Sequence, residues 1–148
     1  MIDIKETVVI DRGIQAVWDW IMDPTNQASW QGSVLEVRFE PADEPVGLGT
    51  RYIETRQFLG KRFETIFEVI EFDAPHRSAI DLVSGPINGR SSFELQELGE
   101  RTGLTLGARV DTGTFFKVAE PALRSYFKRE LSSYIHALKM LVEAPAKV

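Results

Sequence analysis

Residues 120–142 read EPALRSYFKRELSSYIHALKMLV, and this stretch decides the fold. Pro121 suits the first turn of a helix, where its missing N–H costs nothing. Apolar residues recur at three- and four-residue steps, the spacing of one helix face: Leu123, Phe127, Leu131, Tyr134, Leu138 and Leu141. The other side carries charged and polar residues. We therefore predict a long amphipathic helix from Glu120 to Val142.

Before this helix, the chain between Leu35 and Asp111 alternates apolar and polar residues without a helical pattern. The expected strands are Ile2–Ile10, Val34–Glu40, Thr50–Phe58, Lys61–Phe72, Arg77–Ser84, Arg90–Leu98 and Leu104–Asp111. Sequential hairpins of this kind form one antiparallel sheet, which must bury its inner face on essentially one helix. Because a curved sheet around a single helix cannot fill its concave side, we expect an internal cavity.

Two short helices are expected between the first and second strands. Residues Ile14–Met22 place apolar side chains on one face, and Asp11 is a candidate N-cap. The pair Asp23-Pro24 then ends this helix and begins a second helical turn, which finishes near Trp30. Trp18 falls on the apolar face, so we expect it in the core rather than at the rim of a pocket.

Composition limits the function. The 148 residues have the size of one ordinary domain, which we take to span 1–148. A net charge of −5 argues against a nucleic-acid partner, which needs a basic face. The chain has no cysteine, no apolar run long enough for a transmembrane segment and a charged N-terminus, so we expect a cytoplasmic protein. Its two histidines have no neighbours at metal-ligand spacing, so we expect neither a metal nor a cofactor.

Three short patterns resemble one superfamily. They are VWDWIMDP at 17–24 followed by Trp30, GLGT at 47–50, and FDAPHR at 72–77. In this order they are similar to the START, birch-pollen-allergen and polyketide-cyclase superfamily, also called SRPBCC, and to its polyketide cyclase/dehydrase-like branch. The resemblance implies a helix-grip α+β fold, in which a seven-stranded antiparallel curved sheet wraps around a long C-terminal helix. It implies a hydrophobic cavity between sheet and helix, but no single function.

Period-two alternation assigns side chains to the two faces of the sheet. If Leu59 and Gly60 form a two-residue turn, the aromatic inner face pairs Tyr52 with Phe67. The outer face then carries pairs typical of a solvated surface, namely Arg51 with Glu68 and Gln57 with Arg62. The predicted ligand-binding residues are Tyr52, Glu54, Arg56, Phe63, Phe67, Leu82, Ser91, Phe93, Leu106, Phe116 and Phe127.

Two members of this set are charged. Glu54 and Arg56 interrupt an apolar face, and burying them is costly unless they are paired or wet. They are interpreted either as a structural ion pair or as polar anchors for a ligand. Phe116 is included because Phe115 and Phe116 cannot both point inward easily, so that one of them could form a flap over the entrance.

The expected function is binding of a small hydrophobic or amphipathic molecule in the cavity. A polyketide cyclase/aromatase-like enzyme that uses the same cavity is the alternative, with Glu54 and Arg56 as acid, base or orienting groups. A second alternative is an interaction module like the chaperone-ATPase activators of this fold, which would need an exposed apolar patch. Whether the chain is an enzyme stays open, and a homodimer is compatible with the sequence.

Overall fold

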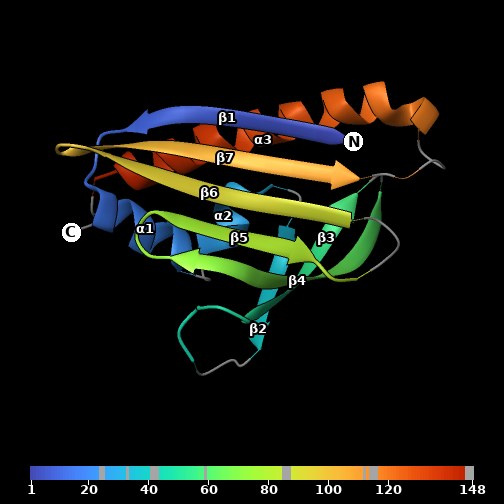
Figure 1. The fold of residues 1–148 in the computed structure, drawn as a ribbon, viewed down its shortest axis with the longest axis horizontal. Helices are drawn as coiled ribbons and strands as arrows, with labels where there is room; N and C mark the ends of the chain where they lie inside the picture. Colours follow the sequence, from blue (N-terminus) through green and yellow to red (C-terminus); the bar gives the residue numbers. More distant parts are fainter. Residues whose placement is uncertain are drawn as a thin grey trace.

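The computed structural model describes residues 1–23, 26–32, 34–40, 44–58, 60–84, 88–111, 113 and 117–145. Seven strands form one antiparallel sheet (Figure 1): β1 (Ile2–Ile10), β2 (Val34–Glu40), β3 (Arg51–Phe58), β4 (Lys61–Asp73), β5 (Arg77–Leu82), β6 (Asn88–Leu98) and β7 (Arg101–Asp111). Their order is β1-β7-β6-β5-β4-β3-β2, so each strand neighbours its sequence neighbour except that β1 lies beside β7. The predicted antiparallel meander is confirmed.

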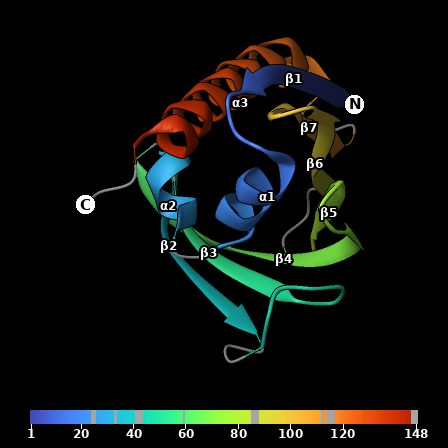
Figure 2. The same cartoon turned by 90° about the vertical axis from the view of Figure 1, so that its left-hand side faces the viewer.

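The helices also follow the predicted order. They are α1 (Ile14–Met22), α2 (Gln27–Trp30), the 3₁₀ turn η2 (Lys117–Ala119) and α3 (Glu120–Glu143). Figure 2 shows the sheet curving around α1 and α3, which lie on its concave side. The N-cap of α1 is Gly13 and no side chain caps it, so the prediction of Asp11 as N-cap was wrong. Instead, the Asp11 backbone N–H donates a hydrogen bond to Glu143 Oε2 (2.7 Å) at the end of α3.

The register of β3 and β4 is the one predicted from a two-residue turn. Tyr52 pairs with Phe67 and Arg51 with Glu68, and Phe58 pairs with Lys61 across the turn. Gly60 has a φ of 76°, a left-handed conformation that glycine adopts without the clash of a Cβ atom. The alternation therefore keeps Tyr52 buried and Arg51 exposed.

The buried core lies between α3, α1 and one side of the sheet. Helix α3 packs mainly on β1, where Ile2 and Ile4 meet its apolar stripe. The buried residues of α3 are Leu131, Ile135, Leu138 and Val142. The predicted stripe included Leu141, but Leu141 is 39% exposed whereas Ile135 is 1% exposed. The buried face of α3 is thus turned slightly about the helix axis relative to the apolar stripe that the sequence predicts.

Strand β4 contains an irregularity that strict alternation does not predict. Its pairing with β5 shifts between Val69 and Glu71, as at a β-bulge. Two residues of β4 then oppose one of β5, which reverses the alternation beyond this point. Phe72 consequently packs edge-on against Trp18 of α1, with ring centroids 5.5 Å apart. The bulge therefore brings an additional aromatic side chain to the concave side.

Candidate functional site

Glu54 lies in the middle of β3 and is 0% exposed. Its carboxylate accepts from Arg56, two residues along the same face, with 2.7 Å between Arg56 Nε and Glu54 Oε2. A second guanidinium nitrogen, Nη2, lies 2.7 Å from the same oxygen. Because a buried charge is costly without an opposite charge, Arg56 is what allows Glu54 to occupy this position.

Arg56 connects β3 to two other elements. Its Nη2 donates to Oε1 of Gln31, which follows α2, over 2.9 Å. Its guanidinium lies 5.8 Å from the ring centroid of Phe67 on β4, and it hydrogen-bonds Tyr134 of α3. Burial would lower the pKa of Arg56, but the Glu54 carboxylate and Tyr134 raise it above its ordinary value. The guanidinium therefore remains charged.

The hydrogen bonds continue along α3. The Tyr134 hydroxyl donates to Glu130 Oε2, one helical turn away. Tyr126 also hydrogen-bonds Glu130, and burial together with this carboxylate raises the pKa of Tyr126, although Arg56 opposes the rise. We call the set Gln31, Glu54, Arg56, Tyr126, Glu130 and Tyr134 the polar network. It joins the sheet to the helix across the interior.

Tyr52 lies next to this network on β3 and is also buried. Desolvation by burial and the negative charge of Glu54 both raise the pKa of Tyr52 well above its ordinary value. The phenol is therefore neutral at any physiological pH. The Tyr52 ring packs edge-on against Phe39 of β2, with centroids 4.9 Å apart.

Burial of the inner face differs from one end of the strands to the other. Tyr52 on β3, Val69 on β4, Leu95 on β6 and Leu106 on β7 are buried. Other predicted residues on the sheet and on α3 are only half-buried: Phe67, Leu82, Ser91, Phe93 and Phe127. Phe63 lies near the β3–β4 turn and is exposed, so the prediction of a cavity-lining role is weakest there. Phe116 lies outside the described residues.

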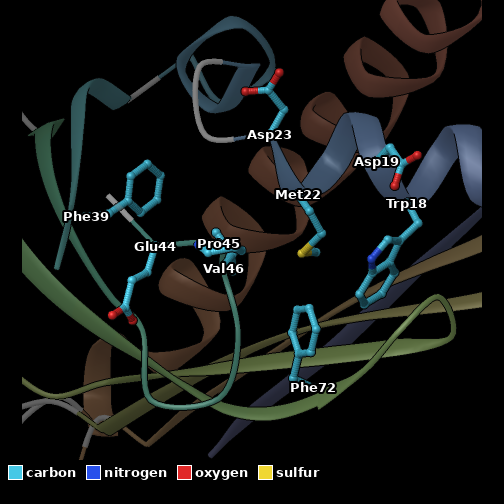
Figure 3. A pocket seen from close by; sticks show the side chains of 9 residues that line it. All are labelled: Trp18, Asp19, Met22, Asp23, Phe39, Glu44, Pro45, Val46 and Phe72. Atoms are coloured by element: carbon cyan, nitrogen blue, oxygen red, sulfur yellow. The ribbon is translucent and has the colours of Figure 1, made fainter. Parts of the chain in front are cut away.

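A shallow, open pocket lies at a different place from the predicted cavity (Figure 3). Its volume is about 360 Å³, and it lies between α1, β2, β4 and the segment before β3. We call it the α1 pocket; it is lined by Trp18, Asp19, Met22, Asp23, Phe39, Glu44, Pro45, Val46 and Phe72. Figure 3 shows Trp18, Met22 and Phe72 gathered on one side of it. None of the described residues predicted to bind ligand lines this pocket, although Phe39 contacts Tyr52.

Sequence reasoning missed Gln31 and Tyr134 as partners of Arg56, and Tyr126 and Glu130 as further members of the polar network. Tyr134 was assigned to the apolar stripe of the last helix, and no spacing in the sequence links it to β3. The described residues contain no group of three or more His, Asp or Glu side chains that could hold a metal ion. No helix within the same ranges is long and apolar enough to cross a membrane.

The chain was compared with protein-family models, with curated proteins and with solved structures. A family model described as polyketide cyclase / dehydrase and lipid transport matches residues 1–143. No curated protein matches the chain. Among solved structures, a START superfamily protein from Mycobacterium smegmatis is 16% identical with a TM-score of 0.76, over 95% of this chain and 97% of that one.

Two further structures have titles that describe an activity. The Zhui aromatase/cyclase from Streptomyces sp. R1128 is 15% identical with a TM-score of 0.77, over 95% of this chain and 93% of that one. Norcoclaurine synthase from Thalictrum flavum, in complex with dopamine and hydroxybenzaldehyde, is 14% identical with a TM-score of 0.70, over 98% and 88%. At these identities the likeness shows the fold alone. With the match over residues 1–143, the resemblance to the SRPBCC superfamily is confirmed, and the chain belongs to the polyketide cyclase/dehydrase and lipid transport family.

Proposed function

We propose that this protein binds a small hydrophobic or amphipathic molecule between α3 and the inner face of β3–β6. The observation that carries the proposal is the unequal burial of this face. Leu106 is sealed in the core, whereas Phe67, Leu82 and Phe93 are half-buried. An apolar surface of this kind, next to a few fixed polar groups, is typical of small-molecule sites.

The arrangement of charges limits the kind of molecule that fits. The apolar body of the ligand would contact Phe67, Leu82 and Phe93. Its polar end would meet Arg56, whose side chain is 26% exposed. Because Glu54 already neutralises Arg56, the pair offers hydrogen bonds without a net charge. This favours a neutral polar group over a free anion, which would have to compete with Glu54 for the guanidinium.

A cyclase-like enzyme that uses the same cavity is the second candidate. The observation that favours it is the polar network, because interior titratable groups linked in this way are able to perform acid–base chemistry. Glu54→Gln separates the two candidates. Under the binding proposal this change alters affinity only, whereas in an enzyme it lowers turnover by about 100-fold or more.

An interaction module is supported less well. The outer face of the sheet carries ion pairs across neighbouring strands, such as Arg51 with Glu68 and Arg90 with Asp81. A partner that docks on an apolar surface would have to displace water from these charges. We therefore rank this function below binding and below catalysis.

Native mass spectrometry of the protein purified from its own host tests the binding proposal. We expect a retained small molecule that is lost from Leu82→Phe, in which a larger side chain fills the space beside Phe67. Val83→Phe is the matched control, because Val83 is the next residue and is exposed. A wild-type protein that carries no molecule, or equal retention by both variants, contradicts the proposal.

A further inference from the structure

The indole of Trp30 contains an unusual buried group. Trp30 is the last residue of α2 and is 5% exposed. Its Nε1 atom is buried and has no hydrogen-bond partner among the described residues. An indole nitrogen can only donate, so an acceptor is required to satisfy it. Native proteins retain few buried donors of this kind, and each one calls for a physical explanation.

The surroundings of Trp30 belong to the site proposed above. Its ring packs edge-on against Phe93 of β6 (5.9 Å between centroids) and against Tyr134 of α3 (6.1 Å). Three oxygens of the polar network accept hydrogen bonds from other donors: Glu54 Oε2 and Gln31 Oε1 accept from Arg56, and Glu130 Oε2 accepts from Tyr134. The Trp30 ring therefore contacts both Phe93 of the half-buried apolar face and Tyr134 of the polar network. Neither of them accepts a hydrogen bond from Trp30 Nε1–H.

We infer that the molecule bound at this site carries a neutral hydrogen-bond-accepting oxygen, such as a carbonyl or ether, and that Trp30 Nε1–H donates to it. The inference rests on the proposed function and narrows its ligand to apolar molecules that carry at least one neutral oxygen acceptor. Nε1 is buried in this structure, so binding requires a side-chain movement beside the indole, whose ring packs against Phe93 and Tyr134. Side-chain rearrangements of this size are common when ligands and partners bind.

The consequence for recognition is selectivity rather than tight binding. A site that hydrogen-bonds an oxygen of its ligand discriminates against an analogue of the same shape without that oxygen, because the donor is then left buried and unpaired. A hydrocarbon analogue would fill the same space beside Phe93 but leave Nε1 unsatisfied. We expect a preference of about 3- to 10-fold for the oxygenated molecule, the size of one neutral hydrogen bond.

Two probes of matched shape test the inference. 2-Acetylnaphthalene has a carbonyl group where 2-isopropenylnaphthalene has a C=CH₂ group. Affinities of both are measured by titration calorimetry for the wild type, for Trp30→Phe and for the control Trp20→Phe. Trp20 is a half-buried tryptophan of α1 that neither the polar network nor the α1 pocket includes. The expected result is an acetyl preference in the wild type and in Trp20→Phe, and a ratio near one in Trp30→Phe.

A spectroscopic measurement accompanies the titrations. In ¹⁵N-labelled protein each tryptophan gives one indole N–H signal, and the Trp30 signal should move downfield with 2-acetylnaphthalene only. If Trp30→Phe does not fold, this signal is assigned by elimination from Trp18→Phe and Trp20→Phe. Equal binding of the two probes by the wild type, or an acetyl preference that survives in Trp30→Phe, overturns the inference and leaves the proposed function standing. Failure of both probes to bind the wild type counts against the proposed function as well.

Discussion

Arg56 is the residue that balances the charge of the buried Glu54 carboxylate. Its guanidinium contacts Glu54, Gln31 and Phe67, so one side chain on β3 reaches β4 and the segment that follows α2. The sequence alone left open whether Glu54 and Arg56 form an ion pair or anchor a ligand. The 2.7 Å contact establishes the pair, while a role as ligand anchor stays a prediction. The two roles are compatible, since Arg56 is partly exposed.

The first prediction concerns this pair. Arg56→Ala removes the guanidinium that contacts the buried Glu54 carboxylate, and we expect a loss of about 3–5 kcal/mol in the free energy of unfolding. Urea titration provides the measurement. Arg90→Ala is the control, because its exposed pair with Asp81 (2.6 Å) should contribute only about 0–1 kcal/mol.

The double variant Glu54→Leu with Arg56→Met separates the charge from the packing. Replacing both members of a buried pair by apolar residues is often neutral or stabilising, so we expect most of the lost stability to return. A double variant as unstable as Arg56→Ala alone would mean that the fold needs the shape or the hydrogen bonds of the pair rather than its neutrality.

At the level of elements, α3 is positioned by its packing on β1. The buried stripe includes Ile135, at 1% exposed, whereas Leu141 is 39% exposed. Ile135→Ala should therefore cost about 2–5 kcal/mol, as for other large-to-small changes in a core. Leu141→Ala should cost less than half as much. Thermal or urea unfolding of the two variants checks this second prediction, and the opposite order would support the stripe predicted from the sequence.

The C-terminal end of α3 is attached to the end of β1 by a cluster of polar contacts around Glu143. Its side chain accepts from the Asp11 backbone N–H (2.7 Å) and from Lys139 Nζ (2.7 Å). Lys139 Nζ also donates to the backbone carbonyl of Val9, over 2.6 Å. The Lys139 ammonium and the Asp11 N–H lower the pKa of Glu143 below its ordinary value of 4.5.

The third prediction follows from the sign of this shift. A carboxyl group whose pKa is lower in the folded state stabilises the fold at pH values above its ordinary pKa, and this contribution is lost as the pH falls through the lowered pKa. Glu143→Gln should thus reduce stability by up to about 1 kcal/mol near neutral pH. The difference from the wild type should shrink below pH 4.5. Glu97→Gln, the same change at an exposed position of β6, is the control.

At the scale of the whole molecule, the inner face of the sheet is buried unevenly. Tyr52, Val69, Leu95 and Leu106 are buried, whereas Phe67, Leu82 and Phe93 are half-buried. The fourth prediction compares the same change at a buried and at a half-buried position. Leu106→Ala should cost about 2–5 kcal/mol of stability. Leu82→Ala should cost less than half of that and should weaken binding of 2-acetylnaphthalene, while Leu106→Ala leaves binding unchanged. Unfolding and titration calorimetry on both variants provide the comparison, and equal stability losses would contradict a half-open inner face.

The sheet is predicted well from the sequence because strand register depends on residues that are close together in the chain. The two-residue separation of Phe58 and Lys61 sets the β3–β4 register, and alternation then assigns every face up to Val69. The bulge after Val69 has no such signal, because one extra residue leaves the apolar pattern almost unchanged. For this reason Phe72, and with it the α1 pocket, was not predicted. The partners of Arg56 were missed because Gln31 and Tyr134 approach it only through tertiary packing.

The pairing of β1 with β7 has a consequence for how the chain is made. Ile2 pairs with Val110 and Ile10 with Thr102, so β1 finds its partner only after about one hundred residues have been added. At about 5–20 residues per second, β1 spends roughly 5–20 s on the ribosome without that partner. Such non-local pairing also slows folding in general. The ladder between β1 and β7 is therefore the part of the sheet whose two strands are furthest apart in time during synthesis.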